Sequence, residues 1–172
     1  MRNKMIWADR KFKFDIPAEM YPIVVERLRG TPARIEEKTR GITEDALSKR
    51  DGDNWSIKEQ IGHLVTVDTL WFARLEDFLS GQQTLTAADM ENKRTRERKF
   101  NEIPVTDILR EFRASREKLV ALLDSVKESQ VELTAHHPRL NQPMRLIDSY
   151  FFAAEHDDHH LAKINDLVQM FR

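Results

Sequence analysis

The chain has 172 residues, no cysteine, and 28 basic against 29 acidic residues, which gives a formal net charge of -1. A chain of this length fits one domain, so a single domain over residues 1–172 is expected. The near balance of charge attracts neither nucleic acid nor anionic lipid, and the lack of cysteine excludes disulfides, thiolate metal ligands and an internal thiol nucleophile.

The composition favours helices. The chain is 40% apolar and 33% charged and has only five glycines, a mixture typical of helices with solvated charged faces. No window approaches the roughly 18 uncharged apolar residues of a membrane span, and the basic N-terminal stretch lacks the apolar core of a signal peptide. We therefore expect an all-α cytoplasmic protein that binds neither nucleic acid nor membrane.

Apolar residues at helical spacing predict a first helix over about residues 17–40. Thr31 followed by Pro32 resembles an N-cap with proline at the first helical position, so this helix either kinks or restarts there. A short helical turn is expected at residues 43–47, and a loop follows it.

The second helix has the clearest start in the sequence. Ser56 followed three residues later by Glu59 forms a capping-box pattern, in which each side chain pairs with a backbone donor of the other residue. Apolar residues continue the helical pattern to about Leu79, and Gly81 marks its end.

Two further helices are predicted over about residues 105–126 and 143–171. The connection over residues 80–104 is polar and long for a simple turn between helices. Such a segment can run the length of a bundle, so that the third helix starts from the same end as the second. The expected fold is an up-down-down-up four-helix bundle with a long crossover between its second and third helices.

Three histidines lie close together in the last predicted helix. With an advance of about 100° per residue, His160 lies among the inward apolar residues, His156 lies roughly 40° from it, and His159 lies roughly 100° away. A histidine pair at i and i+4 places both rings on one face, which suits chelation of a single ion.

His63, at the edge of the apolar stripe of the second helix, is a candidate third ligand. Three imidazoles suit zinc or nickel, with iron and copper as alternatives, and leave a coordination position for water or substrate. The alternative is that each is an ordinary hydrogen-bonded core histidine.

Other residues near these histidines allow two interpretations. Asp157 and Glu155 either orient a ligand's distal N–H or are ordinary helix charges. Glu59 is explained by its cap but could also face the site, and His159 is expected in a supporting or surface position. His136 and His137, beside Pro138, are expected to be solvated loop residues.

The order and spacing of four segments resemble the DinB-like superfamily of bacterial proteins. They are RGTPARI (Arg29 to Ile35), NWSIKEQIGHL (Asn54 to Leu64), HPRL (His137 to Leu140) and AEHDDHHLAKI (Ala154 to Ile164). The resemblance spans nearly the whole chain. It implies an up-down-down-up bundle, often a homodimer, with one divalent metal held by His63, His156 and His160.

The resemblance leaves the reaction open. Some relatives are bacillithiol or mycothiol S-transferases, which implies a small-molecule substrate and a low-molecular-weight thiol activated by the metal. A metal-dependent hydrolase that uses metal-bound water is the first alternative, with Asp157 or Glu59 as base. A non-enzymatic stress-response or interaction bundle is the second. No HExxH zinc-protease motif and no nucleotide-binding glycine loop is present.

Overall fold

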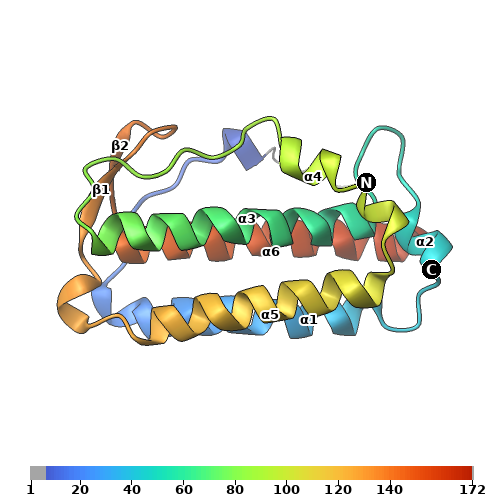
Figure 1. Ribbon diagram of the computed structural model, residues 1–172, viewed down its shortest axis with the longest axis horizontal. Helices are drawn as coiled ribbons and strands as arrows, with labels where there is room; N and C mark the ends of the chain where they lie inside the picture. Colours follow the sequence, from blue (N-terminus) through green and yellow to red (C-terminus); the bar gives the residue numbers. More distant parts are fainter. Residues whose placement is uncertain (1–6, 172) are drawn as a thin grey trace.

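The computed structural model describes residues 7–171 and contains four long helices packed as a bundle (Figure 1). Their bounds are α1 (Tyr21–Thr39), α3 (Ile57–Leu79), α5 (Val105–Asp124) and α6 (Leu146–Phe171). Helix α1 packs against α5 and α6, and α3 packs against the same two helices. The predicted all-α four-helix bundle is therefore confirmed.

The directions of the helices follow from the chain colours in Figure 1, which run one way in α1 and α6 and the opposite way in α3 and α5. The connection between α3 and α5 runs along the outside of the bundle, over α3 (Figure 1). Shorter helical elements are η1 (Trp7–Asp9), η2 (Ala18–Met20), α2 (Glu44–Ser48), α4 (Lys93–Glu97), η3 (Phe100–Glu102) and η4 (Glu128–Gln130).

A β-hairpin that the sequence did not indicate closes one end of the bundle. It consists of β1 (Thr134–His137) and β2 (Gln142–Arg145), which pair antiparallel around Asn141 at φ 52°. Helix α6 therefore begins at Leu146 and not at about residue 143. Strands of four residues are too short for their alternation to be distinguished from a loop.

The crossover is tied to the hairpin at its start and to α3 near its end. At the start of the crossover, the Leu85 N–H donates to the carbonyl of His136 at 2.9 Å, and the His136 N–H donates to that of Gln83 at 2.8 Å. At its end, the ring of Phe100 lies against Gly62, where a Cβ atom would be only 2.2 Å from the ring. These contacts hold the crossover along α3, on the side where His63 lies.

Helix α1 is continuous through Pro32, which resolves the choice between a kink and a restart. Proline has no N–H, so the carbonyl of Leu28, one turn earlier, loses its usual helical partner. The Nη1 atom of Arg116 on α5 lies 3.4 Å from that carbonyl oxygen. A donor from a neighbouring helix thus takes the place of the missing backbone hydrogen bond.

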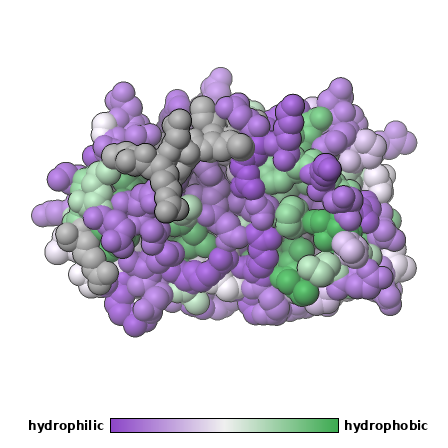
Figure 2. All heavy atoms as spheres, turned by 180° about the vertical axis from the view of Figure 1, so that it is seen from behind, coloured by the Kyte–Doolittle hydropathy of each residue, from purple (hydrophilic) through white to green (hydrophobic). Residues whose placement is uncertain are grey.

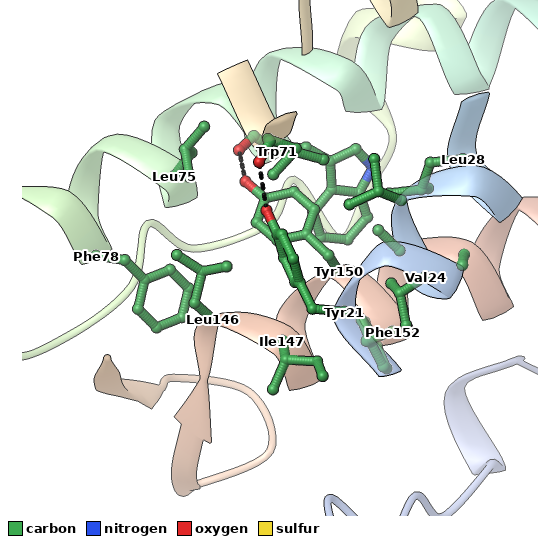
Figure 3. Packing of buried hydrophobic residues seen from close by; sticks show 14 of the residues in the cluster. Tyr21, Val24, Leu28, Trp71, Leu75, Phe78, Leu146, Ile147, Tyr150 and Phe152 are labelled. Carbon is green, nitrogen blue, oxygen red and sulfur yellow. Dashed lines mark hydrogen bonds between the residues drawn. The ribbon is translucent and has the colours of Figure 1, made fainter. Parts of the chain in front are cut away.

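The apolar core fills the space between the four helices, and Figure 3 shows its part nearest the hairpin. Buried tyrosines satisfy their hydroxyl groups on backbone carbonyls. Tyr150 donates to Trp71 at 2.8 Å (Figure 3), and Tyr21 donates to Leu123 at 2.9 Å. The outer face in Figure 2 is mainly hydrophilic, with hydrophobic residues gathered toward the hairpin end. No helix within residues 7–171 has the length and apolarity needed to cross a membrane.

Candidate metal centre

The capping box at the start of α3 is formed as predicted and sets the position of the residues that follow it. The Ser56 hydroxyl accepts from the Glu59 N–H at 3.1 Å, and Glu59 accepts from the Ser56 N–H at 2.9 Å. The first turns of α3 carry Gln60 and His63 on the side that faces α6.

The structure brings His63, His156 and His160 together. The Nε2 atom of His156 lies 3.3 Å from that of His63 and 3.2 Å from that of His160. All three side chains are buried, and one ring nitrogen from each lies within 4.8 Å of the other two. Three Nε2 atoms from two helices therefore converge on one point, as a single ion would require.

A hydrogen bond on the far side of the His160 ring decides which of its two nitrogens carries the proton. The Nδ1 of His160 lies 2.6 Å from Oε1 of Gln60, an oxygen that can only accept, so Nδ1 carries the proton and Nε2 keeps its lone pair. The Nδ1 of His63 lies 3.2 Å from the hydroxyl of Thr95 on α4. The Nδ1 of His156 is buried and has no partner within the described residues.

The surroundings keep these imidazoles neutral. Burial lowers the pKa of His63 to about 4, with the charge of Lys163 acting in the same direction. Burial, followed by repulsion from the neighbouring histidines, holds the pKa of His156 and that of His160 well below the usual range. Neutral imidazole is the form that binds a metal, so the donor set fits a divalent transition ion.

Two tryptophans enclose the triad. The ring of Trp55 lies 4.9 Å from that of His63 and is stacked at 6.5 Å on that of His160. The ring of Trp7 meets His156 edge to face at 5.2 Å. These apolar rings lower the local dielectric around the triad and leave it open on the side of a cavity.

That open side is a large cavity of about 1640 Å³, which contains the three histidines in its wall. The cavity runs from Trp55 along α3 to Arg74 and is covered by residues of the crossover. His159, which was expected in a supporting or surface position, is half-buried at this wall with its ring 5.5 Å from that of Trp7.

Asp157 does not orient a histidine and is not an ordinary surface charge, so both interpretations of this residue were wrong. It is fully buried, pairs with Arg116 on α5, and accepts from the Thr31 hydroxyl at 2.8 Å. Arg116 also binds Asp68 on α3 at 2.8 Å. Asp157 therefore belongs to an ion cluster in the core behind the triad.

The structure also settles the positions of Glu155, Glu59 and His137. Glu155 pairs with Arg10 and Arg27 at the bundle surface, as an ordinary helix charge would. Glu59 pairs with Arg50 in addition to its cap, and no contact to the triad is found for it among the described residues. His137, expected in solvent, is buried with 1% of its surface exposed, because the unpredicted hairpin carries it against the bundle.

Sequence reasoning did not identify the two hydrogen-bond partners of the triad. Gln60 lies three residues before His63, and this i, i+3 spacing on one helix was a usable signal because it places both side chains on the same face. Thr95 gave no such signal. It comes from the crossover, 32 residues beyond His63, and its position depends on how that segment packs.

Comparisons with known proteins agree on family and fold. The profile of the DinB superfamily matches residues 27–164. The structure is similar to that of YfiT from Bacillus subtilis, described as a probable metal-dependent hydrolase with an unusual four-helix bundle topology. For that pair, the TM-score is 0.79 and the sequence identity 21%, over 94% of this chain and 93% of that one.

A second solved structure, of a protein from Streptococcus pneumoniae, has a TM-score of 0.65 and 13% identity, over 94% of this chain and 91% of that one. At sequence identities this low, the structural similarity shows a shared fold and nothing further. No curated protein matches the chain.

Proposed function

The chain belongs to the DinB superfamily, and from this membership and the geometry of the triad we propose that it is a metal-dependent enzyme that activates a small thiol for S-transfer. In this proposal His63, His156 and His160 hold one divalent transition metal through their Nε2 atoms. Zinc and nickel are the proposed ions, because neutral imidazole suits both.

The observation that carries the proposal is the fixed tautomer of His160. Gln60 holds the proton on Nδ1, so the Nε2 lone pair faces two other Nε2 atoms, the nearer at 3.2 Å. Lone pairs that face one another in a buried site repel unless a proton or a cation lies between them. A neutral His156 ring with its proton on Nε2 can donate to only one of the two neighbouring Nε2 atoms, whereas a single metal ion binds the lone pairs of all three.

Three protein ligands leave a coordination position open on the cavity side, which is the catalytic type of site. When bound there, a divalent ion supplies Lewis acidity that lowers the pKa of a coordinated thiol or water. The Trp55 and Trp7 rings lie against His63 and His156 in the wall of the same cavity. The cavity has room for a thiol and an electrophile together.

The ion pairs of the two carboxylates considered as general bases favour a thiol over water as the nucleophile. Asp157 and Glu59, the two carboxylates considered as general bases, are paired with Arg116 and Arg50. A thiol, with an ordinary pKa near ~8.5, ionises far more readily than water and needs no separate base. Because the chain has no cysteine, the thiol comes from a substrate.

The test combines the zinc-loaded or nickel-loaded full chain with bacillithiol, mycothiol or glutathione and the electrophile monobromobimane. We expect conjugation above the uncatalysed rate, and we expect His160→Ala to abolish it. His136→Ala, which removes a histidine outside the triad, should keep the rate. A rate that is equal in the wild type and the His160→Ala variant refutes the proposal. Metal analysis of untagged protein identifies the ion.

Metal-dependent hydrolysis is the second candidate, and the likeness to YfiT favours it, since that protein is described as a probable metal-dependent hydrolase. It predicts turnover of an ester, amide or phosphoester without any thiol, and loss of that turnover in His160→Ala. Thiol-independent, metal-dependent turnover replaces the first proposal with this one.

A further inference from the structure

The hairpin end of the cavity contains hydrogen-bond donors that the metal centre does not use. They are Arg74 on α3, His137 in β1, and Arg139 in the turn after β1. All three line the same cavity as the histidine triad. His137 and Arg139 belong to the HPRL segment, a motif to which the proposed thiol chemistry assigns no role.

His137 presents a buried N–H that has no acceptor. Its Nδ1 accepts from the backbone N–H of Leu140 at 3.2 Å, so the proton of the neutral ring lies on Nε2. Burial lowers the pKa of His137 to about 4, with the nearby charges of Arg74 and Arg139 acting in the same direction, so the ring is neutral. Within the described residues, its Nε2 finds no hydrogen-bond partner.

Arg74 is a buried cation, with 1% of its surface exposed. Its Nε donates to the carbonyl of Thr86 at 3.1 Å, which leaves the four N–H groups of its two terminal nitrogens. It forms no ion pair with any residue in the range 7–171. Asp77, a carboxylate whose charge acts on the pKa of Arg74, accepts instead from the Thr86 N–H at 2.6 Å. A buried cation without a carboxylate partner is costly.

Aromatic rings connect these donors to the metal centre. The guanidinium of Arg139 lies 5.7 Å over the ring of Phe152, and the ring of His137 meets the same ring edge to face at 5.9 Å. Phe152 lies 5.0 Å from Trp7, whose ring touches His156. The cavity thus has donors at one end, an apolar middle, and the triad at the other end.

We propose that Arg74, His137 and Arg139 form a subsite for an oxyanion, the carboxylate or phosphate of a substrate whose other end reaches the histidine triad. This inference deepens the proposed function and rests on it for the second half of that statement. A carboxylate or phosphate supplies the acceptors that the His137 N–H and the guanidinium of Arg74 lack, and it neutralises the buried charge.

Trp71 limits the length of such a substrate. Its ring centroid lies 5.5 Å from the guanidinium carbon of Arg74 and 6.2 Å from the centroid of the His156 ring, so the guanidinium and the triad are separated by no more than about 12 Å. The proposed substrate class is therefore an anion with an apolar or aromatic middle, whose reacting atom lies several bonds from its charge.

The test measures binding without metal, so that it does not depend on catalysis. The EDTA-treated full chain is titrated by calorimetry with 4-phenylbutyrate, 4-phenylbutylphosphonate and the neutral 4-phenylbutyramide. Tryptophan fluorescence gives a second readout, because Trp7, Trp55 and Trp71 all line the cavity. We expect the better of the two anions to bind about 10-fold more tightly than the amide.

The variants locate the site. Arg139→Gln, His137→Phe and Arg74→Gln should each reduce the preference for the anion to within about twofold. The matched control is Arg94→Gln, since Arg94 lines the same cavity but binds the Thr69 hydroxyl at 2.9 Å, and it should keep the preference. Circular dichroism and melting temperature verify folding. If the variant of the buried Arg74 does not fold, Arg139→Gln and His137→Phe still test the subsite.

Equal binding of anions and amide overturns the subsite, and so does an Arg94→Gln effect as large as that of Arg139→Gln. The His160→Ala variant should bind 4-phenylbutyrate as the wild type does. Anion binding together with an inactive triad would therefore contradict only the proposed reaction, whereas thiol conjugation without anion preference would contradict only the subsite.

Discussion

Gln60 shows how one side chain determines the chemistry of another. Its Oε1 fixes the proton of His160 on Nδ1 and directs the lone pair of Nε2 toward the two other histidines. The amide cannot rotate freely because Gln60 is buried on α3, one turn before His63. Residues that hold a metal ligand in its binding tautomer commonly matter nearly as much as the ligand itself.

We therefore predict that Gln60→Ala weakens zinc binding by about 10-fold to 100-fold without removing a ligand. The measurement is competition with a chelating dye, and Gln82→Ala, at an exposed position just beyond the end of α3, serves as control. An affinity within twofold of the wild type in Gln60→Ala would show that the tautomer is set in another way.

Asp157 and His156 are adjacent in the sequence but have different roles. Successive residues of a helix differ by about 100° in direction, so His156 faces the cavity while Asp157 faces Arg116 in the core. Helical geometry placed both on the inner half of α6. Only the neighbouring helices determine which inner direction leads to the cavity and which to the core.

At the scale of elements, the crossover determines the site as much as the helices do. Thr95 in α4 binds His63, and Phe100 in η3 lies against Gly62, next to His63. The absence of a side chain at Gly62 allows the Phe100 ring to approach the α3 backbone. The two contacts hold the crossover against the turn of α3 that carries the metal ligand.

Gly62→Ala should therefore destabilise the fold by about 1–3 kcal/mol, because the new Cβ would lie 2.2 Å from the ring of Phe100. Gly30→Ala on α1 is the matched control. Its Cβ would meet only Arg34, at 3.9 Å, so we expect stabilisation by about 0.5–1 kcal/mol from higher helix propensity. Urea unfolding measures both, and equal effects would contradict a close packing of Phe100 on Gly62.

At the scale of the whole molecule, one buried ion cluster joins all four long helices. Arg116 on α5 pairs with Asp68 on α3 and Asp157 on α6, and it lies 3.4 Å from the Leu28 carbonyl of α1. Burial raises the pKa of Asp68 to about 6, although Arg116 opposes this shift. The cluster requires all four helices to meet in one arrangement.

Arg116→Met should cost about 3–5 kcal/mol, because it leaves two carboxylates buried without a cation. Replacing the two aspartates by leucine in the same variant should recover most of that loss. Arg113→Met, which breaks a surface pair with Glu36, should cost less than about 1 kcal/mol. Thermal unfolding of the wild type, Arg116→Met, the variant that also replaces both aspartates, and Arg113→Met checks this order of stabilities. An Arg116→Met loss as small as that of Arg113→Met would contradict the role of the cluster.

The stability of the fold should depend on pH in part through His137. Its folded pKa is about 4, while an unfolded histidine titrates near ~6.5, so between these values the unfolded chain binds the extra proton. The stabilisation that comes from a neutral His137 in the folded chain is complete above the pKa of the unfolded histidine, and it is lost as the pH falls toward 4. After burial, the groups that lower its pKa are Arg74 from α3, Arg139 from the turn after β1, and His136 beside it in β1.

In EDTA, we expect His137→Phe to lose stability less steeply than the wild type between pH 6.5 and 4, by about 1 kcal/mol per pH unit. Urea unfolding at intervals of half a pH unit measures the two slopes. Parallel slopes would mean that the pKa of His137 is the same in the folded and the unfolded chain.

Features that depend on local spacing follow from the amino-acid sequence without any knowledge of packing. Helical periodicity indicated the four long helices, the Ser56 and Glu59 pair marked the start of α3, and the i, i+4 spacing placed His156 and His160 on one face. All of them derive from the 3.6-residue turn, which is a property of the chain itself.

The remaining features depend on contacts between elements. The hairpin that buries His137, the Thr95 bond to His63 and the attachment of Asp157 to Arg116 each join residues from different parts of the chain. Their physical basis is packing and burial in three dimensions, which no periodicity in the sequence encodes. The same packing gathers Arg74 and the HPRL segment at one end of the cavity and the histidine triad at the other.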